Sequence, residues 1–142
     1  MKRFCAYMYA TAMLVAVLFF ENFVSSFELG VLIVPYFVVI VCAALFASLL
    51  SDWYKSSQRY FGLVAVPVCV GILSPLVAGQ MFALAMFMSM PETGYSISSF
   101  FTGIYASVVF ILYTSPVLVL GLCLASFGTH RFLNRTGESN AT

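Results

Sequence analysis

Residues 61–90 form the longest uncharged stretch of the chain, with thirty consecutive residues that include no Asp, Glu, Lys, Arg or His. As a helix that rises ~1.5 Å per residue, this stretch would be ~45 Å long, whereas the hydrocarbon core of a bilayer is roughly 30 Å thick. The run therefore predicts a helix that crosses a membrane and that tilts, kinks or extends beyond it.

Three further uncharged stretches, at 4–20, 29–51 and 100–127, are shorter companions of the same kind. Only 8% of the 142 residues are charged, against ~25% in soluble domains, so polar groups are too few to cover a soluble surface. We predict an all-α integral membrane protein whose transmembrane domain, residues 1–127, contains four spans at 4–20, 29–51, 61–90 and 100–127. Residues 128–142 contain few apolar side chains and are predicted to be a disordered tail.

The first span has a second interpretation. Met1, Lys2 and Arg3 followed by an apolar run are typical of a signal peptide, and small residues at Val24 and Ser26 would suit a cleavage site. The residues just before that site, 21–23, are Glu, Asn and Phe, which approach a cleavage site poorly. We therefore favour an uncleaved first transmembrane helix.

The distribution of charge predicts the orientation. All six Lys and Arg residues lie at the N-terminus, in the connection 52–60 or in the tail, whereas the connections 21–28 and 91–99 contain Glu and no base. Short loops rich in Lys and Arg stay in the cytoplasm, so both termini are predicted to be cytoplasmic, in the plasma (inner) membrane if the source is a prokaryote. Because the connections are short, we expect an antiparallel four-helix bundle.

The stretch 61–90 also contains the candidate contact surface. In membranes, helices associate where small residues let backbones approach closely, and proline adds a kink that frees a carbonyl group. The candidate residues for helix packing or partner contact are Pro67, Gly71, Ser74, Pro75, Ala78, Gly79 and Gln80. This strip could pack against the chain's own helices, or it could bind another membrane protein or a second copy of the chain.

Gln80 is the one carboxamide within a predicted span, and it should face another helix, because hydrocarbon offers it no hydrogen-bond partner. No ionisable residue lies deep within a predicted span, although proton-coupled carriers and ion pumps normally keep one there. Gln80 could still line the path of a small oligomeric channel or transporter.

The sequence offers no set of catalytic residues, and we predict neither enzymatic activity nor a cofactor. Cys5, Cys42, Cys69 and Cys123 lie in four separate stretches without a C-x-x-C pair, so we expect packing roles in the core and no metal site. Six basic residues at three places make no nucleic-acid surface.

The lipid bilayer is therefore the partner that the sequence predicts directly. The preferred function is a non-enzymatic membrane protein that acts through helix–helix contacts, as an accessory subunit, an immunity or exclusion factor, or part of a larger complex. A membrane-protein partner or a homo-oligomer would fit this function. The alternative is the small oligomeric channel or transporter, with Gln80 and the kinked third helix lining the path.

Overall fold

The computed structural model describes residues 2–23, 29–54, 59–89 and 97–139, and every element within these ranges is a helix. The elements are α1 (Lys2–Phe23), α2 (Leu29–Leu50), the short 3-10 helix η1 (Ser51–Tyr54), α3 (Arg59–Ser89) and α4 (Ile97–Ser139). Parts of the three predicted connections, and the possible cleavage site at 24–26, lie outside the described residues.

Four helical stretches are long and apolar enough to cross a membrane. They are Lys2–Asn22, Ile33–Tyr54, Phe61–Met88 and Ile97–Leu133. Over the described ranges, the prediction of an all-helical chain with four candidate membrane helices is confirmed.

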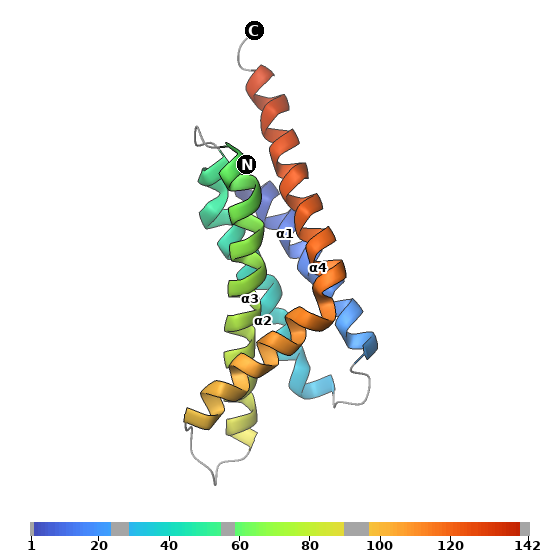
Figure 1. Ribbon diagram of the computed structural model, residues 1–142, viewed down its shortest axis with the longest axis vertical. Coiled ribbons are helices and arrows are strands. Elements are labelled where there is room, and N and C mark those ends of the chain that lie inside the picture. The colour runs from blue at the N-terminus through green and yellow to red at the C-terminus, as the bar shows by residue number, and fades with distance from the viewer. Residues whose placement is uncertain (1, 24–28, 55–58, 90–96, 140–142) are drawn as a thin grey trace.

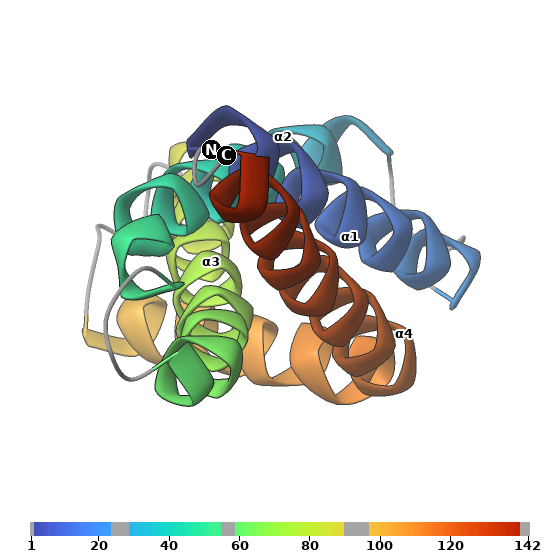
Figure 2. The same ribbon diagram turned by 90° about the horizontal axis from the view of Figure 1, so that it is seen from above.

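The four long helices pack around a shared core (Figures 1 and 2). Each packs against its neighbour in the chain, and α4 also packs against α1, which closes the ring. The N- and C-termini lie at the same end of the molecule, which we call the terminal end. The opposite end, where α1 ends and α2 begins, we call the distal end.

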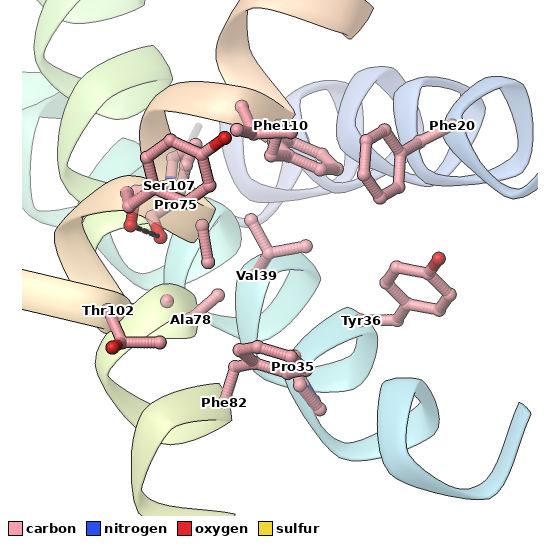
Figure 3. A pocket seen from close by; sticks show the side chains of 14 residues that line it. Phe20, Pro35, Tyr36, Val39, Pro75, Ala78, Phe82, Thr102, Ser107 and Phe110 are labelled. Carbon is pink, nitrogen blue, oxygen red and sulfur yellow. Dashed lines mark hydrogen bonds between the residues drawn. The ribbon is translucent and has the colours of Figure 1, made fainter. Parts of the chain in front are cut away.

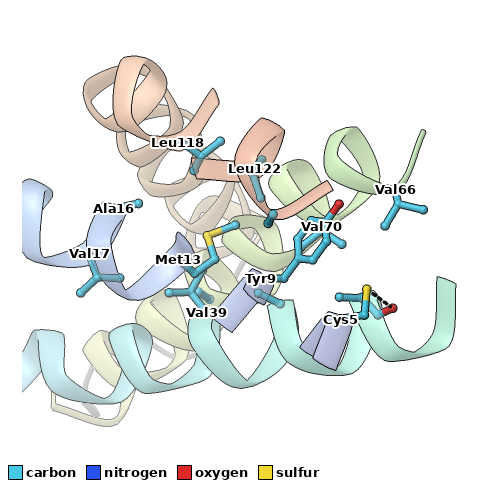
Figure 4. Close-up of a cluster of buried hydrophobic side chains, with 14 of the residues drawn as sticks. Cys5, Tyr9, Met13, Ala16, Val17, Val39, Val66, Val70, Leu118 and Leu122 are labelled. Atoms are coloured by element: carbon cyan, nitrogen blue, oxygen red, sulfur yellow. Dashed lines mark hydrogen bonds between the residues drawn. The ribbon is translucent and has the colours of Figure 1, made fainter. Parts of the chain in front are cut away.

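The spacing of the residues explains which helix faces form the core. On α1 the buried residues recur every three or four positions, which places them on one face of the helix, and α2 repeats this pattern. Figure 4 shows several of these side chains meeting between the helices. The core residues of these two helices include Cys5, Tyr9, Met13, Ala16, Val17, Phe20, Val39, Ala43 and Ala47.

Helix α4 bends near its middle (Figure 1). Pro116 lies within this helix, and it has no N–H to donate to the carbonyl oxygen of Leu112 one turn earlier, which is a common cause of a helix bend. The Ser115 hydroxyl donates to that carbonyl oxygen at 2.9 Å, which satisfies the acceptor. The bend separates the first half of α4, which lies at the distal end, from the second half, which runs toward the terminal end.

The structure differs from the predicted disordered tail, because α4 continues as a helix through Ser139. Thr129 is fully buried and donates to the carbonyl oxygen of Ala125 at 2.8 Å. The Phe132 ring stacks on the Phe4 ring of α1 with 4.4 Å between centroids, and Leu133 packs against the core. These contacts hold the helix beyond residue 127, and the composition of residues 128–142 as a whole gave no sign of them.

Candidate functional site

The small-residue strip of α3 lies against α4. Gly79 is buried where the two helices cross, and a Cβ there would collide with the Ser107 side chain and the carbonyl oxygen of Gly103. Ser107 is buried with its hydroxyl oxygen 2.9 Å from the carbonyl oxygen of Pro75 and 2.8 Å from that of Gly103, so it can donate to either. The absence of a side chain at Gly79 therefore allows a close helix crossing that one serine hydroxyl bridges.

The other strip residues continue this packing toward the terminal end. A Cβ at Gly71 would lie 2.7 Å from a methyl carbon of Leu122 on α4. Pro67 and Ser74 are also buried, whereas Ala78, at 7% exposure, lines a cavity described below. The strip thus lies within the chain's own packing.

Gln80 is half-buried at the same crossing. Its Nε2 donates to the carbonyl oxygen of Phe100 on α4 at 3.3 Å, and its carboxamide lies against Gly103. The side chain therefore links α3 to the first turn of α4, as a polar group in hydrocarbon should.

A cavity of about 270 Å³ lies beside this crossing, in the distal half of the molecule (Figure 3). All four long helices contribute to its wall, and the wall is almost entirely apolar and partly open. The lining residues are Phe20, Pro35, Tyr36, Val39, Pro75, Ala78, Gly79, Phe82, Thr102, Tyr105, Ala106, Ser107, Val109 and Phe110.

Aromatic rings form one wall of the cavity. Phe20, from the last turns of α1, packs against Phe110 of α4 with 5.1 Å between ring centroids. Phe20 also meets the Tyr36 ring of α2 edge-on, at 6.4 Å. These rings are fixed against one another and define one side of the space.

The polar groups on the cavity wall differ in how they are satisfied. Thr102 donates to the carbonyl oxygen of Ser98 at 3.0 Å, and the Ser107 hydroxyl serves the helix crossing. The Tyr36 hydroxyl is buried and has no hydrogen-bond partner among the described residues. A buried unpaired hydroxyl is uncommon and costly, and Tyr36 is the cavity-lining residue that carries one among the described residues.

Three hydroxyls, those of Tyr9, Tyr54 and Ser126, meet toward the terminal end, and we call them the hydroxyl cluster. The Tyr54 hydroxyl is 2.6 Å from the Tyr9 hydroxyl and 2.9 Å from that of Ser126, and Ser126 lies 2.9 Å from the carbonyl oxygen of Leu63. These residues come from η1, α1, α4 and α3, so the cluster joins four of the five helical elements that the structure describes. No local sequence pattern predicts the cluster, because Tyr9 and Tyr54 are 45 positions apart and Tyr54 and Ser126 are 72 apart.

The cysteines occupy different environments, and the expectation of four core thiols was wrong. Cys5 is fully buried and its thiol donates to the carbonyl oxygen of Ala47 at 3.4 Å. Cys42 and Cys69 are half-buried, while Cys123 is exposed between Leu120 and Leu124 on the outer face of α4. A thiol is apolar enough for a face that borders hydrocarbon, so helix apolarity alone could not tell core from surface.

Among the residues that the structure describes, no three His, Cys, Asp or Glu side chains are grouped as metal ligands would be. Comparison of the chain with protein-family models, with curated proteins and with solved structures found no match. The function must therefore be inferred from the cavity, the helix crossing and the hydroxyl cluster of this chain itself.

Proposed function

We propose that the chain is a multi-pass protein with antiparallel helices and both termini in the cytoplasm, located in the plasma (inner) membrane if the source is a prokaryote. Lys2 Nζ lies 3.6 Å from the Asp52 carboxylate, so the start of α1 lies beside η1. Arg131 and Arg135 are exposed on the last turns of α4, near the C-terminus at the same end. This gathering of bases at the terminal end supports a cytoplasmic location for that end.

We further propose that the protein is non-enzymatic and acts within the membrane through contacts between helices. It would serve as an accessory subunit, an immunity or exclusion factor, or a component of a larger complex. The observation that carries this proposal is the separation of side chains by type. Small and hydroxyl residues such as Gly79 and Ser126 lie between the helices, whereas Leu49, Leu112 and Leu124 are each more than 60% exposed. Such outer faces suit packing against another apolar helix.

The test is photocrosslinking in cells from a reactive amino acid placed singly at Leu49, Leu112 or Leu124, on different exposed faces. A partner contact should give a discrete protein adduct from one face, and an adduct of twice the chain's mass would identify a second copy. The matched control is the same amino acid at buried Val70, which should give no adduct. Absence of protein adducts from all three faces, together with a monomer in mild detergent, would contradict the proposal.

The channel alternative has less support. Gln80, the polar residue expected to line a path, bonds to the backbone of α4, and the lining of the nearby cavity is almost entirely apolar. An apolar wall does not replace the hydration shell of an ion or polar solute. If Gln80→Leu changed the flux of a solute through liposomes that contain the protein, the channel would become the better proposal.

A further inference from the structure

We propose that the distal cavity binds one acyl chain of a membrane diacyl glycerolipid and that the Tyr36 hydroxyl donates a hydrogen bond to an ester carbonyl oxygen of that lipid. This inference stands on the cavity and does not depend on the protein partner proposed above. It assigns a ligand class to the cavity and a partner to a buried hydroxyl.

The first support is the size and chemistry of the space. Apolar cavities of ~150 Å³ stay dry and can bind benzene, and this one is larger, at about 270 Å³. The wall is formed by aromatic and aliphatic side chains, including Phe20, Val39 and Phe110. Such a space suits several methylene groups in a row and does not suit a cluster of waters, which would need polar partners.

The second support is what lies outside the opening. The cavity is partly open, and its lining includes Tyr105, which is 72% exposed on α4. This residue lies within the candidate span Ile97–Leu133, on a helix half whose outer residues Phe101 and Val108 are apolar and exposed. An opening beside Tyr105 would face acyl chains, which surround every membrane helix at high concentration. The occupant is therefore already present in the membrane.

The third support is the depth of the unpaired hydroxyl. Tyr36 lies near the start of α2, and its hydroxyl lies within electrostatic range of the Glu21 carboxylate at the end of α1. Because a carboxylate avoids deep hydrocarbon, the Tyr36 hydroxyl lies near the boundary between hydrocarbon and headgroups, where the ester carbonyls of glycerolipids lie. Figure 3 shows the Tyr36 side chain at one end of the lining, beside Phe20. A chain that entered the cavity would therefore bring its ester group to the level of the Tyr36 hydroxyl.

The Ser74 hydroxyl is also buried without a partner among the described residues, but Ser74 is not part of the cavity lining. The lipid assignment therefore explains the unpaired hydroxyl of the lining residue Tyr36 and makes no claim about that of Ser74.

The first experiment measures lipid retention by native mass spectrometry of the purified full chain, delipidated stepwise and then exposed to a diacyl phosphatidylglycerol. The wild type should retain one lipid per chain. Ala78→Leu and Ala106→Leu each add volume to the cavity from a different helix, and each should reduce retention at least tenfold. Ala65→Leu, at a half-buried position of α3 outside the lining, is the matched control and should retain the lipid.

Two filling variants on separate helices keep this test decisive if one of them fails to fold, which circular dichroism and gel filtration would report. Equal retention by the wild type and a folded filling variant would overturn the proposal. So would a filling variant that loses no lipid but releases a bound protein, because the cavity would then hold a partner's side chain.

The second experiment separates the ester contact from chain burial. The same measurement compares the diacyl lipid with its dialkyl ether analogue, which has the same chains and headgroup but no carbonyl. The wild type should favour the diacyl lipid about two- to tenfold, as expected for one neutral hydrogen bond. Tyr36→Phe should remove this preference and leave retention of the ether lipid unchanged, whereas Tyr7→Phe, at a 73% exposed position, should keep the preference. Absence of a preference in the wild type, or co-purification of a different lipid class in the cavity, would overturn the assignment.

Discussion

Gly79 and Gly71 show how differently two glycines of one strip constrain the same helix. At Gly79, a new Cβ would collide with the Gly103 carbonyl oxygen, a backbone atom that cannot move unless α4 moves with it. At Gly71, the closest atom is the end of the Leu122 side chain, which can rotate away. The close crossing of α3 and α4 therefore depends on position 79 far more than on position 71.

We predict that Gly79→Ala destabilises the protein by about 1–3 kcal/mol, the usual cost of overpacking. Gly71→Ala should cost less, because the contact is flexible and alanine is favoured over glycine within a helix. The measurement is unfolding of each purified variant in mixed micelles with increasing SDS, followed by circular dichroism. Equal losses at the two positions would show that the crossing tolerates the backbone shift.

Because α4 bends, its two halves make different helix contacts. Its first half crosses α3 at Gly79, and its second half lies against α1, where a Cβ at Gly121 would approach the Ala12 methyl at 3.2 Å. The cavity lining from α4, residues 102–110, belongs entirely to the first half. The bend therefore lets one helix keep both contacts, and the half before it contributes to the cavity wall.

We predict that Pro116→Ala straightens α4, because the new N–H can donate to the Leu112 carbonyl oxygen, the acceptor that Ser115 now satisfies at 2.9 Å. Spin labels at the exposed positions Thr102 and Phe127 should move apart, and double electron–electron resonance spectroscopy would measure the change in distance. Leu120→Ala, an outward substitution in the same helix, should leave the distance unchanged. An unchanged distance in Pro116→Ala would mean that packing against α3 and α1 sets the bend without the proline.

At the scale of the whole molecule, the hydroxyl cluster joins parts of the chain that the apolar core only packs together. Tyr54 is at its centre, because its hydroxyl meets both Tyr9 and Ser126. Tyr9 and Tyr54 are each no more than 1% exposed. Hydrocarbon offers no water to these tyrosine hydroxyls, so each must form its hydrogen bonds within the protein.

Tyr54→Phe should destabilise the protein by about 1–2 kcal/mol, because it removes two hydrogen bonds and leaves the Tyr9 hydroxyl without its recorded partner, while Ser126 keeps the Leu63 carbonyl. Tyr9→Phe removes one of the same bonds, so the double variant should lose less than the sum of the two single variants. Tyr7→Phe is the exposed control, and the same SDS unfolding measures all four. Strict additivity would show that the two tyrosines do not stabilise each other.

The features that depend on local composition can be predicted from the sequence. The uncharged runs predict four membrane helices, and the small size of Gly79 predicts a close approach to a neighbouring helix. The hydroxyl cluster and the cavity depend on tertiary geometry, because Tyr9, Tyr54 and Ser126 meet only after the helices pack. The helix beyond residue 127 depends on tertiary contacts, such as the stack of Phe132 on Phe4 and the packing of Leu133 against the core, that no local sequence pattern predicts.

The hydroxyl cluster can form completely only after Ser126 has been synthesised. Ser126 follows Tyr54 by 72 residues, which at ~5–20 residues per second is a delay of roughly 4–14 s. During that interval the nascent chain contains both tyrosines but not the serine, so the two tyrosines can pair only with each other or with groups outside the final arrangement. The helices α1 to α3 are therefore synthesised while this hydrogen-bonded cluster is still incomplete, and α4 is the helix that completes it.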